Sequence, residues 1–408
     1  MEYRAKNSRI YIFSEPCQHT DRPIMTSEAL ASIPIIHSRW KELKPTGDVP
    51  TGRIGHTAVC SPDKQVLYVW GGVNETADRG SRYMDDLFRF EIATSTWHTV
   101  PTAGEKPCAR AFHTAVLYKG MMYIFGGCNG KGRFNRIFKM DPESGLCTIL
   151  NTTGEPPTTR YCHTAVQYQT SMIVFGGKCG GRNSNKRLAD MFSYDFGTVG
   201  WTSIQQQGDI PESRSAHTAV VSGSRMLMFG GRNANGDCCE DLFEFNLVTD
   251  TWRRVELRSP LFGRARHSAI VHNERLIVFG GWNGKKKMND LFILRLDTMT
   301  FEYLQDTDEA DESLPCRREC HTAVVCENSM FLCCGRFRGL FLNDVFELPL
   351  HMKSLKELVR DWIILGAVSY DGDVQSLPHN IVCYLDEYTS SGLFNRSQKS
   401  INSEEGYD

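Results

Sequence analysis

Histidine and cysteine are the side chains of this sequence that could most readily do chemistry. Six of its twelve histidines stand in one recurring motif, with an Arg three residues before the His and a Thr-Ala or Ser-Ala pair after it. These six are His56, His113, His163, His217, His267 and His321. A zinc site needs three or four ligands that converge within about 2.0–2.3 Å of one point. Because each of the six belongs to a different copy of the motif, we expect a structural role and no metal site.

The cysteines indicate a reducing compartment. There are fifteen of them, an odd number, and no two form a C-x-x-C pair. Many fall inside apolar runs, as in VVCENSMFLCCG. This pattern is typical of free, buried thiols rather than of a disulfide framework. We therefore expect a cytoplasmic and/or nuclear protein.

Catalytic motifs are missing from the sequence. It contains no phosphate-binding loop, nucleophile elbow or H-E-x-x-H. The glycine-rich stretches GGKCGG and GGCNGKG are interpreted as turns, because no helix follows to offer its N-terminal amides to a phosphate. We expect no cofactor and no enzymatic activity.

Composition and charge exclude further classes of protein. The chain has 408 residues, 41% of them hydrophobic and 23% charged, and a formal net charge of −2. This balance predicts a globular protein with a real core and neither a nucleic-acid binder nor a membrane-surface protein. No apolar run reaches the roughly 18 residues of a spanning helix, and the N-terminus shows no secretory signal.

A repeat must position these residues. The six motif histidines are spaced 57, 50, 54, 50 and 54 residues apart. About fifteen residues after each comes an apolar run that ends in Gly-Gly, such as YVWGG or IVFGG; the sixth copy reads LCCGR. A third strand pattern follows, as in DDLFRFE, and then Trp97, Trp201 or Trp252, with Cys147 and Phe301 at the equivalent places. Each unit of about 50 residues thus predicts four strands.

Six four-stranded units predict an all-β, six-bladed β-propeller over residues 34–350. The doublet glycines and spaced Trp resemble kelch repeats over roughly residues 36–350. The sixth unit lacks its Trp strand, but Trp40 precedes Arg53 by 13 residues, as Trp97 precedes Arg110. We therefore expect the Trp40 segment to complete the last blade and to leave no open edge strand.

The loops after each Gly-Gly are rich in cations, and few of their acids are free. In a four-stranded blade these loops open on the same face as the loops that lead into the first strand. Their basic residues are Lys131, Arg133, Lys178, Arg182, Lys186, Arg187, Arg232, Lys285, Lys286, Lys287, Arg336 and Arg338. Two interpretations remain open: a solvated rim, or a concave basic pocket for an anionic peptide group, which the guanidinium fork binds well.

The chain changes character after residue 350. Ser354 and Glu357 form a capping box, and an apolar stripe runs along the helix that follows, at Leu355, Leu358, Val359, Trp362 and Ile363. A second segment carries Leu377, Pro378, Ile381 and Leu385. We expect a helical region over 351–388, between the propeller and a disordered tail (389–408), with a partly flexible tail at residues 1–33. These apolar faces either pack on the propeller or bind partner proteins.

The two segments resemble a pair of partner-binding motifs. Ser354, Leu355 and Ile363 match the elongin-C-binding box, with Val359 where Cys is usual. Leu377, Pro378, Ile381 and Leu385 match the cullin 2 box. With a kelch propeller before them and no BTB segment, the chain resembles the kelch-domain substrate receptors of cullin 2–elongin B/C ubiquitin ligases. The resemblance implies elongin B/C and cullin 2 as partners and ubiquitin transfer by those partners.

The resemblance also implies a substrate site. Some receptors of this family bind the extreme C-terminus of their substrates through an Arg after the fourth Gly-Gly, a second Arg and a Ser. Arg232 matches the first Arg, whereas the Asp237–Cys238 region and Ala265 depart from the other two. We expect Lys178, Arg266, Arg336 and Arg338 to face the same channel and to bind substrate termini or acidic peptides. The alternative function is a kelch scaffold in cytoskeletal or vesicle-traffic complexes.

Overall fold

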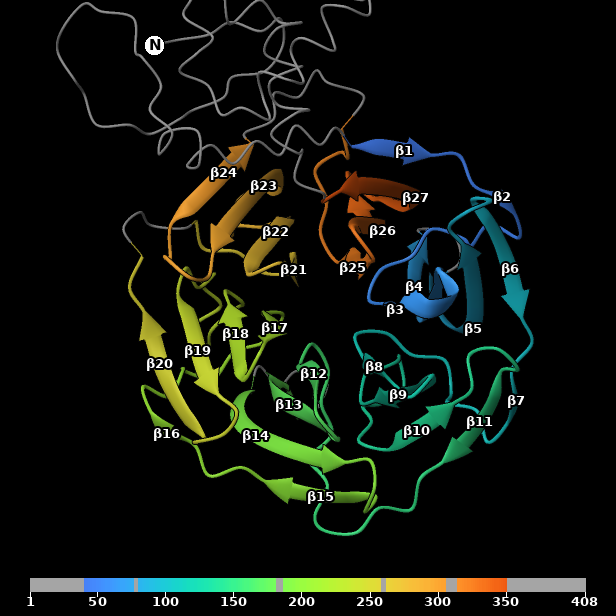
Figure 1. Ribbon diagram of the computed structural model, residues 1–408. Coiled ribbons are helices and arrows are strands. Elements are labelled where there is room, and N and C mark those ends of the chain that lie inside the picture. Colours follow the sequence, from blue (N-terminus) through green and yellow to red (C-terminus); the bar gives the residue numbers. More distant parts are fainter. Residues whose placement is uncertain (1–39, 77–79, 181–185, 258–261, 306–313, 351–408) are drawn as a thin grey trace, which may run out of the picture. The chain divides into compact units, whose positions relative to one another are not determined.

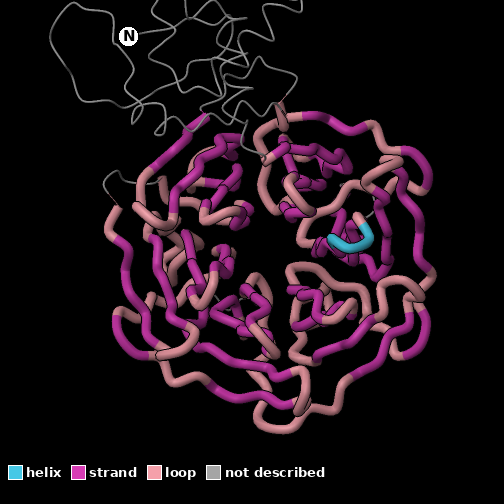
Figure 2. Tube along the Cα trace, in the orientation of Figure 1, coloured by secondary structure: helices cyan, strands magenta, loops and turns pink. Residues whose placement is uncertain are grey.

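The computed structural model describes residues 40–76, 80–180, 186–257, 262–305 and 314–350. In this part of the chain six sheets of mainly antiparallel strands surround a central axis as the blades of a propeller (Figure 1). Strands and loops account for it apart from one 3-10 turn, η1 (Pro62–Lys64) (Figure 2). The all-β, six-bladed prediction is confirmed. The predicted tails and the predicted helical region at 351–388 lie outside the described residues.

The first three blades are built from consecutive strands, innermost first. Blade 1 consists of β3 (Thr57–Ser61), β4 (Val66–Thr76), β5 (Gly80–Glu91) and β6 (Thr96–Val100). Blade 2 consists of β8 (Thr114–Tyr118), β9 (Met121–Phe125), β10 (Ile137–Met140) and β11 (Leu146–Ile149). Blade 3 consists of β12 (Thr164–Tyr168), β13 (Ser171–Lys178), β14 (Arg187–Asp195) and β15 (Gly200–Ser203).

The other three blades repeat this order, except at the closure. Blade 4 consists of β17 (Thr218–Ser222), β18 (Arg225–Phe229), β19 (Leu242–Asn246) and β20 (Thr251–Val255). Blade 5 consists of β21 (Ser268–His272), β22 (Arg275–Trp282), β23 (Lys287–Arg295) and β24 (Phe301–Gln305). Blade 6 consists of β25 (Thr322–Cys326), β26 (Ser329–Phe337), β27 (Leu340–Pro349) and, as its outer strand, β1 (Lys41–Leu43).

Strand β1 closes the ring in the predicted way. It pairs antiparallel with β27, with Lys41 opposite Glu347 and Leu43 opposite Val345. Trp40, immediately before β1, is buried, and its ring lies 5.2 Å from that of Phe279 in blade 5. The closing strand thus removes the open edge of blade 6 and anchors it against its neighbour.

Three blades carry a short fifth strand that the sequence patterns did not predict. These strands lie parallel to the outer strand of the blade: β2 (Thr46–Gly47) on β6, β7 (Ala103–Gly104) on β11 and β16 (Gln207–Gly208) on β20. Gly47 has a φ of +78°, and a Cβ there would lie 2.3 Å from the carbonyl oxygen of Trp97. Only glycine fits so close to the outer strand.

The core lies between blades rather than within them. Trp70 and Leu87 of blade 1 pack with Met122 and Ile124 of blade 2 in one buried cluster, and Phe90 and Trp97 join residues of blade 6 in another. Each large apolar side chain buried in this way contributes about 1.5–3 kcal/mol. The propeller is therefore held by contacts that no isolated blade could make.

The motif arginines connect the strands of each blade. All six are almost fully buried, and each donates from Nη1 to the carbonyl oxygen 16 to 18 residues later, which lies within or just after the second strand. Five also form bidentate hydrogen bonds of 2.5–3.1 Å with an Asp that lies in the third strand or, for Asp241, directly before it: Arg53–Asp86, Arg160–Asp190, Arg214–Asp241, Arg264–Asp290 and Arg318–Asp344. The recurring Asp thus holds the motif Arg of its blade in place.

Candidate functional site: the mouth of the central channel

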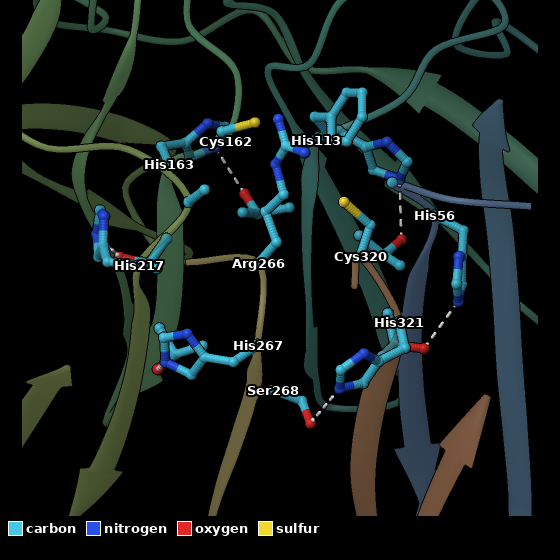
Figure 3. Close-up of a pocket in the computed structure, with 18 of the residues that line it drawn as sticks. His56, His113, Cys162, His163, His217, Arg266, His267, Ser268, Cys320 and His321 are labelled. Atoms are coloured by element: carbon cyan, nitrogen blue, oxygen red, sulfur yellow. Dashed lines mark hydrogen bonds between the residues drawn. The ribbon is translucent and has the colours of Figure 1, made fainter. Parts of the chain in front are cut away.

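The motif histidines form a closed ring around the central channel. The Nε2 atom of each lies 2.8–2.9 Å from a Thr or Ser hydroxyl of an adjacent blade (Figure 3). The pairs are His56–Thr322, His113–Thr57, His163–Thr114, His217–Thr164, His267–Thr218 and His321–Ser268. These contacts join the blades, so the histidines do serve the scaffold. The described residues contain no group of three or more side chains arranged to hold a metal ion.

Burial keeps these histidines neutral. It lowers the pKa of His56, His217 and His321 to about 3 and that of the other three well below 6.5, and the motif arginines act in the same direction. Desolvation disfavours a charged imidazole in such a site. The ring lines a cavity of about 280 Å³ and adds no positive charge to it near neutral pH.

A second ring forms the mouth of the channel. It consists of the residues just before the histidines, all with φ between +53° and +62°: Gly55, Phe112, Cys162, Ala216, Arg266 and Cys320. From blade 2 onward the N–H of each donates to the carbonyl oxygen of the same position in the preceding blade, at 2.7–2.9 Å. Figure 3 shows Arg266 reaching between Cys162 and Cys320. All six residues of this ring line the channel cavity.

Equivalent backbone bridges place three of the predicted cations around the mouth. In every blade the residue after the motif Arg is bridged to the residue that follows the glycines. These bridges put Lys178 opposite Tyr161, Arg232 opposite Ser215 and Arg336 opposite Glu319. In blade 5 the bridged pair is Ala265 and Trp282. Lys178, Arg232 and Arg336 thus occupy the same level of three different blades.

The cations of blades 5 and 6 surround a buried carboxylate, which we call the paired half. Glu319 accepts hydrogen bonds from Arg266 at 2.8 Å and Arg336 at 3.0 Å, and Lys287 lies 3.4 Å from it. Burial would raise the pKa of Glu319, but the charges of Arg266 and Lys287 and the hydrogen bonds of both arginines lower it overall. Glu319 lies outside the Gly-Gly loops and offsets much of the positive charge of this half.

The cations of blades 2 to 4, Arg133, Lys178, Arg187 and Arg232, form a different group, which we call the cationic half. The pKa of Lys178 is lowered by burial and then by Arg187, Arg133 and Arg232. The pKa of Arg187 is likewise lowered by burial and then by Arg232. Neither Arg133 nor Arg232 forms an ion pair with a carboxylate of the described chain. These positive charges repel one another, and an anion between them would relieve that repulsion.

Aromatic rings support the cationic half. The guanidinium of Arg133 lies 5.1 Å and the ammonium of Lys178 6.0 Å from the centre of the Tyr161 ring. Arg232 lies 5.0 Å from the ring of Trp282 and donates from Nε to the carbonyl oxygen of Gly236 at 2.9 Å. These contacts orient the guanidinium groups while leaving donors available for an anion.

The sequence identified only part of this group. Arg133 and Arg187 were in the basic loops but outside the predicted site, and Tyr161 and Trp282 were missed. Tyr161 directly follows a motif Arg and Trp282 directly follows Gly-Gly, so the repeat alignment could have found both. Arg338 lies apart, in the exposed turn between β26 and β27, over the Phe337 ring. The C-terminal residues Leu355, Val359, Ile363, Leu377, Pro378, Ile381 and Leu385 lie outside the described residues.

Comparison with known proteins agrees with this architecture. The model of the KLHDC2/KLHL20/DRC7 Kelch-repeats domain matches residues 4–231 and 162–358. Human Kelch domain-containing protein 3 is 29% identical over 268 residues, which are 62% of this chain and 69% of that protein. Tip elongation aberrant protein 1 of Schizosaccharomyces pombe is 37% identical over 202 residues, which are 48% of this chain and 17% of that protein.

A solved structure shows the same fold. The structure of YjhT superposes with a TM-score of 0.54 at 17% identity and covers 73% of this chain and 94% of YjhT. At that identity the likeness concerns the fold alone. Among the residues that the structure describes, no helix has the length and apolar character needed to cross a membrane.

Proposed function

Since the chain belongs to the KLHDC2/KLHL20/DRC7 Kelch-repeats family, we propose that it is a non-catalytic recognition subunit that binds an anionic peptide group at the mouth of its propeller. Kelch propellers typically serve as binding scaffolds, and the mouth offers charge and shape rather than an acid, base or nucleophile set for catalysis. The anionic group is a C-terminal carboxylate or an acidic side chain of a protein substrate.

The observation that carries this proposal is the cationic half. Arg133, Lys178, Arg187 and Arg232 come from three blades, and burial, followed by repulsion from neighbouring cations, lowers the pKa of Lys178 and of Arg187. A bound carboxylate would accept charge-assisted hydrogen bonds worth about 1.5–3 kcal/mol each. The paired half is a weaker candidate, because Arg266 and Arg336 already serve Glu319.

We further propose that the C-terminal segments deliver the bound protein to a ubiquitin ligase. In this proposal Leu355, Val359 and Ile363 bind elongin C, and Leu377, Pro378, Ile381 and Leu385 bind cullin 2. Their support is the motif match in the sequence. The chain would then contribute proximity between substrate and ligase, while the partners transfer ubiquitin.

The proposed peptide binding is tested with a library of peptides that have free C-termini. Peptides captured by the full chain are synthesised again with a C-terminal amide and, separately, with neutral replacements of internal acids. A terminal carboxylate site predicts that amidation alone abolishes binding, and an internal acidic motif predicts the reverse. Capture of peptides insensitive to both changes would contradict recognition of an anionic group.

The ligase arm is tested by reconstitution with purified elongin B/C and cullin 2. We expect the full chain to form a complex and Leu355→Asp to lose elongin binding without a change in the thermal midpoint. Absence of binding by the unmodified chain would favour the kelch scaffold instead. A sharp fall in the midpoint of Leu355→Asp would show that the C-terminal helix packs on the propeller.

A further inference from the structure

Blade 2 lacks the carboxylate that its motif arginine meets in every other blade. Ile137 pairs with Phe125 in the register in which Leu87 pairs with Trp70. The residue before Leu87 is Asp86, whereas the residue before Ile137 is Arg136. An exposed arginine therefore replaces the structural aspartate. Arg110, which is 1% exposed, has no carboxylate partner among the described residues.

The nearest substitute for that carboxylate is a thiol. Arg110 donates from Nε to the carbonyl oxygen of Cys108 at 3.0 Å and from Nη1 to that of Gly126 at 3.0 Å. Its remaining terminal nitrogen, Nη2, lies 3.3 Å from Sγ of Cys108. The rings of Phe134 and Phe138 lie 4.1 and 5.1 Å from the guanidinium carbon. The guanidinium is thus enclosed, and it is directed at a cysteine that is exposed to solvent.

The charge of Arg110 is less well satisfied than that of its counterparts. Burial lowers the pKa of Arg110, and Cys108 opposes that effect only in part. Burial also acts to lower the pKa of Arg214 and Arg318, but the hydrogen bonds and charges of Asp241 and Asp344 outweigh it, so both are raised. An anion beside Arg110 would supply the negative charge that a carboxylate supplies in the other blades.

The chain contains a matched control for Cys108. In blade 6 the cysteine two residues before the motif Arg is Cys316, and its Sγ lies 3.4 Å from Nη2 of Arg318. That arginine also donates two hydrogen bonds of 2.7 Å to Asp344. The two thiols therefore have similar arginine geometry, but only in blade 6 does a carboxylate already neutralise the guanidinium.

We propose that Cys108 is a modification site, an exposed nucleophilic thiol that lies against the buried guanidinium of Arg110 and reacts with soft electrophiles of the α,β-unsaturated carbonyl class. The thiol proton goes to solvent. The sulfur then forms a bond to the β-carbon, and the π electron pair of the C=C bond moves to the carbonyl as an enolate, which takes a proton from water. No oxidant or reductant is needed. A thiolate beside a cation is the usual form of a reactive cysteine, and this proposal does not depend on the proposed function.

The position of Cys108 gives such a modification a structural consequence. The N–H of Arg110 donates to the carbonyl oxygen of Met84 in blade 1, and the carbonyl oxygen of Ala109 accepts from the side chain of Asn129 in the β9–β10 loop. That loop also carries Arg133 of the cationic half. An adduct on Cys108 would occupy the junction of blades 1 and 2 and take the sulfur away from Arg110.

The test measures alkylation rates of individual cysteines in the native full chain with limiting N-ethylmaleimide, read by peptide mass spectrometry. We expect Cys108 to react at least tenfold faster than Cys316. Because the two thiols also differ in exposure, the decisive comparison is Arg136→Asp, which supplies the missing carboxylate to Arg110 and leaves Cys108 in place. Its rate at Cys108 should fall roughly tenfold, the equivalent of about 1.4 kcal/mol.

Arg136→Asn separates the two effects of that substitution. It removes the surface charge of Arg136 without adding a carboxylate, so the rate at Cys108 should stay within about twofold of the unmodified chain. Equal slowing in both variants would overturn the proposal, because the surface charge would then be the cause. An unchanged rate in Arg136→Asp would overturn it as well. Thermal midpoints of both variants confirm that the rates refer to folded protein.

Discussion

The two halves of the channel mouth are built from the same repeat yet handle charge in opposite ways. In the paired half, Arg266, Lys287 and Arg336 share the buried carboxylate of Glu319. In the cationic half, the pKa of Lys178 and that of Arg187 are lowered by burial and then by the positive charges of their neighbours, among them Arg232. The number of cations in the loops does not by itself distinguish the two halves. The comparison shows that one acid at a bridged position, Glu319, gives the cations of the paired half a shared carboxylate.

The difference comes from one position of the repeat. The residue after the motif Arg is Tyr161 in blade 3, Ser215 in blade 4 and Glu319 in blade 6, and each is bridged to a cation. Tyr and Ser leave the positive charge of their partner intact, whereas Glu cancels it. An anionic ligand should therefore bind beside blades 3 and 4 rather than beside blade 6.

Acidification should affect both halves at once, because both are built on the histidine ring. The folded ring holds its histidines neutral with a pKa of about 3 for His56, His217 and His321, below the ordinary 6.5. Unfolding then takes up protons below pH 6.5, so stability is full above that pH and is lost as the pH falls. Six such groups give up to about 8 kcal/mol per pH unit, against a total of about 5–15 kcal/mol.

We therefore expect the thermal midpoint to drop steeply between about pH 6.5 and 5 and the chain to unfold near the lower limit. The measurement is a series of thermal scans across this range at constant ionic strength. A midpoint that stays flat through the whole range would show that the histidines are protonated in the folded state.

Substitution of one cation in each half gives the next largest effect. Arg232→Ala should weaken binding of a captured peptide by about 10- to 100-fold, because it removes a charge-assisted hydrogen bond. Arg336→Ala, the equivalent position of the paired half, should change affinity by less than about threefold. Fluorescence anisotropy with a labelled peptide measures both. Equal losses would mean that the ligand spans the two halves and that the distinction is wrong.

Removal of the Glu319 carboxylate should make the paired half similar in charge to the cationic half. Glu319→Gln leaves Arg266, Lys287 and Arg336 without their common anion, so their repulsion should lower the free energy of unfolding by about 1–3 kcal/mol. Acidic peptides should then bind a few-fold tighter. Glu240→Gln is the control, because Glu240 is exposed and forms no ion pair within the described chain. An unchanged affinity would show that the paired half does not face the ligand.

A conservative change tests the geometry of the cationic half. Arg232→Lys keeps the charge but loses the planar fork and much of the contact with Trp282. We expect a loss of affinity of about 3- to 10-fold, smaller than that of Arg232→Ala. If Arg232→Lys binds the peptide as tightly as the unmodified chain, Arg232 contributes only its charge. The affinities of Arg232→Lys and of the unmodified chain should then show the same dependence on salt concentration.

The blades, their number and their closure could be predicted from the sequence alone. Each of these depends on local patterns: an Arg and a His three residues apart, an apolar run that ends in Gly-Gly, and Trp40 at the same 13-residue distance from Arg53 that Trp97 keeps from Arg110. Strand alternation and turn glycines act over a few residues, so they repeat visibly along the chain.

Which charged side chains come into contact can be seen only in the tertiary structure. Glu319 contacts Arg266 across 53 residues of sequence, and Arg187 contacts Ser215 across 28, because closing the ring brings neighbouring blades together. The sequence shows Arg136 as one more loop cation, whereas the register of β10 shows that it leaves Arg110 beside the Cys108 thiol. Coulomb interactions depend on separation and burial in space, and neither can be read from the order of residues along a repeat.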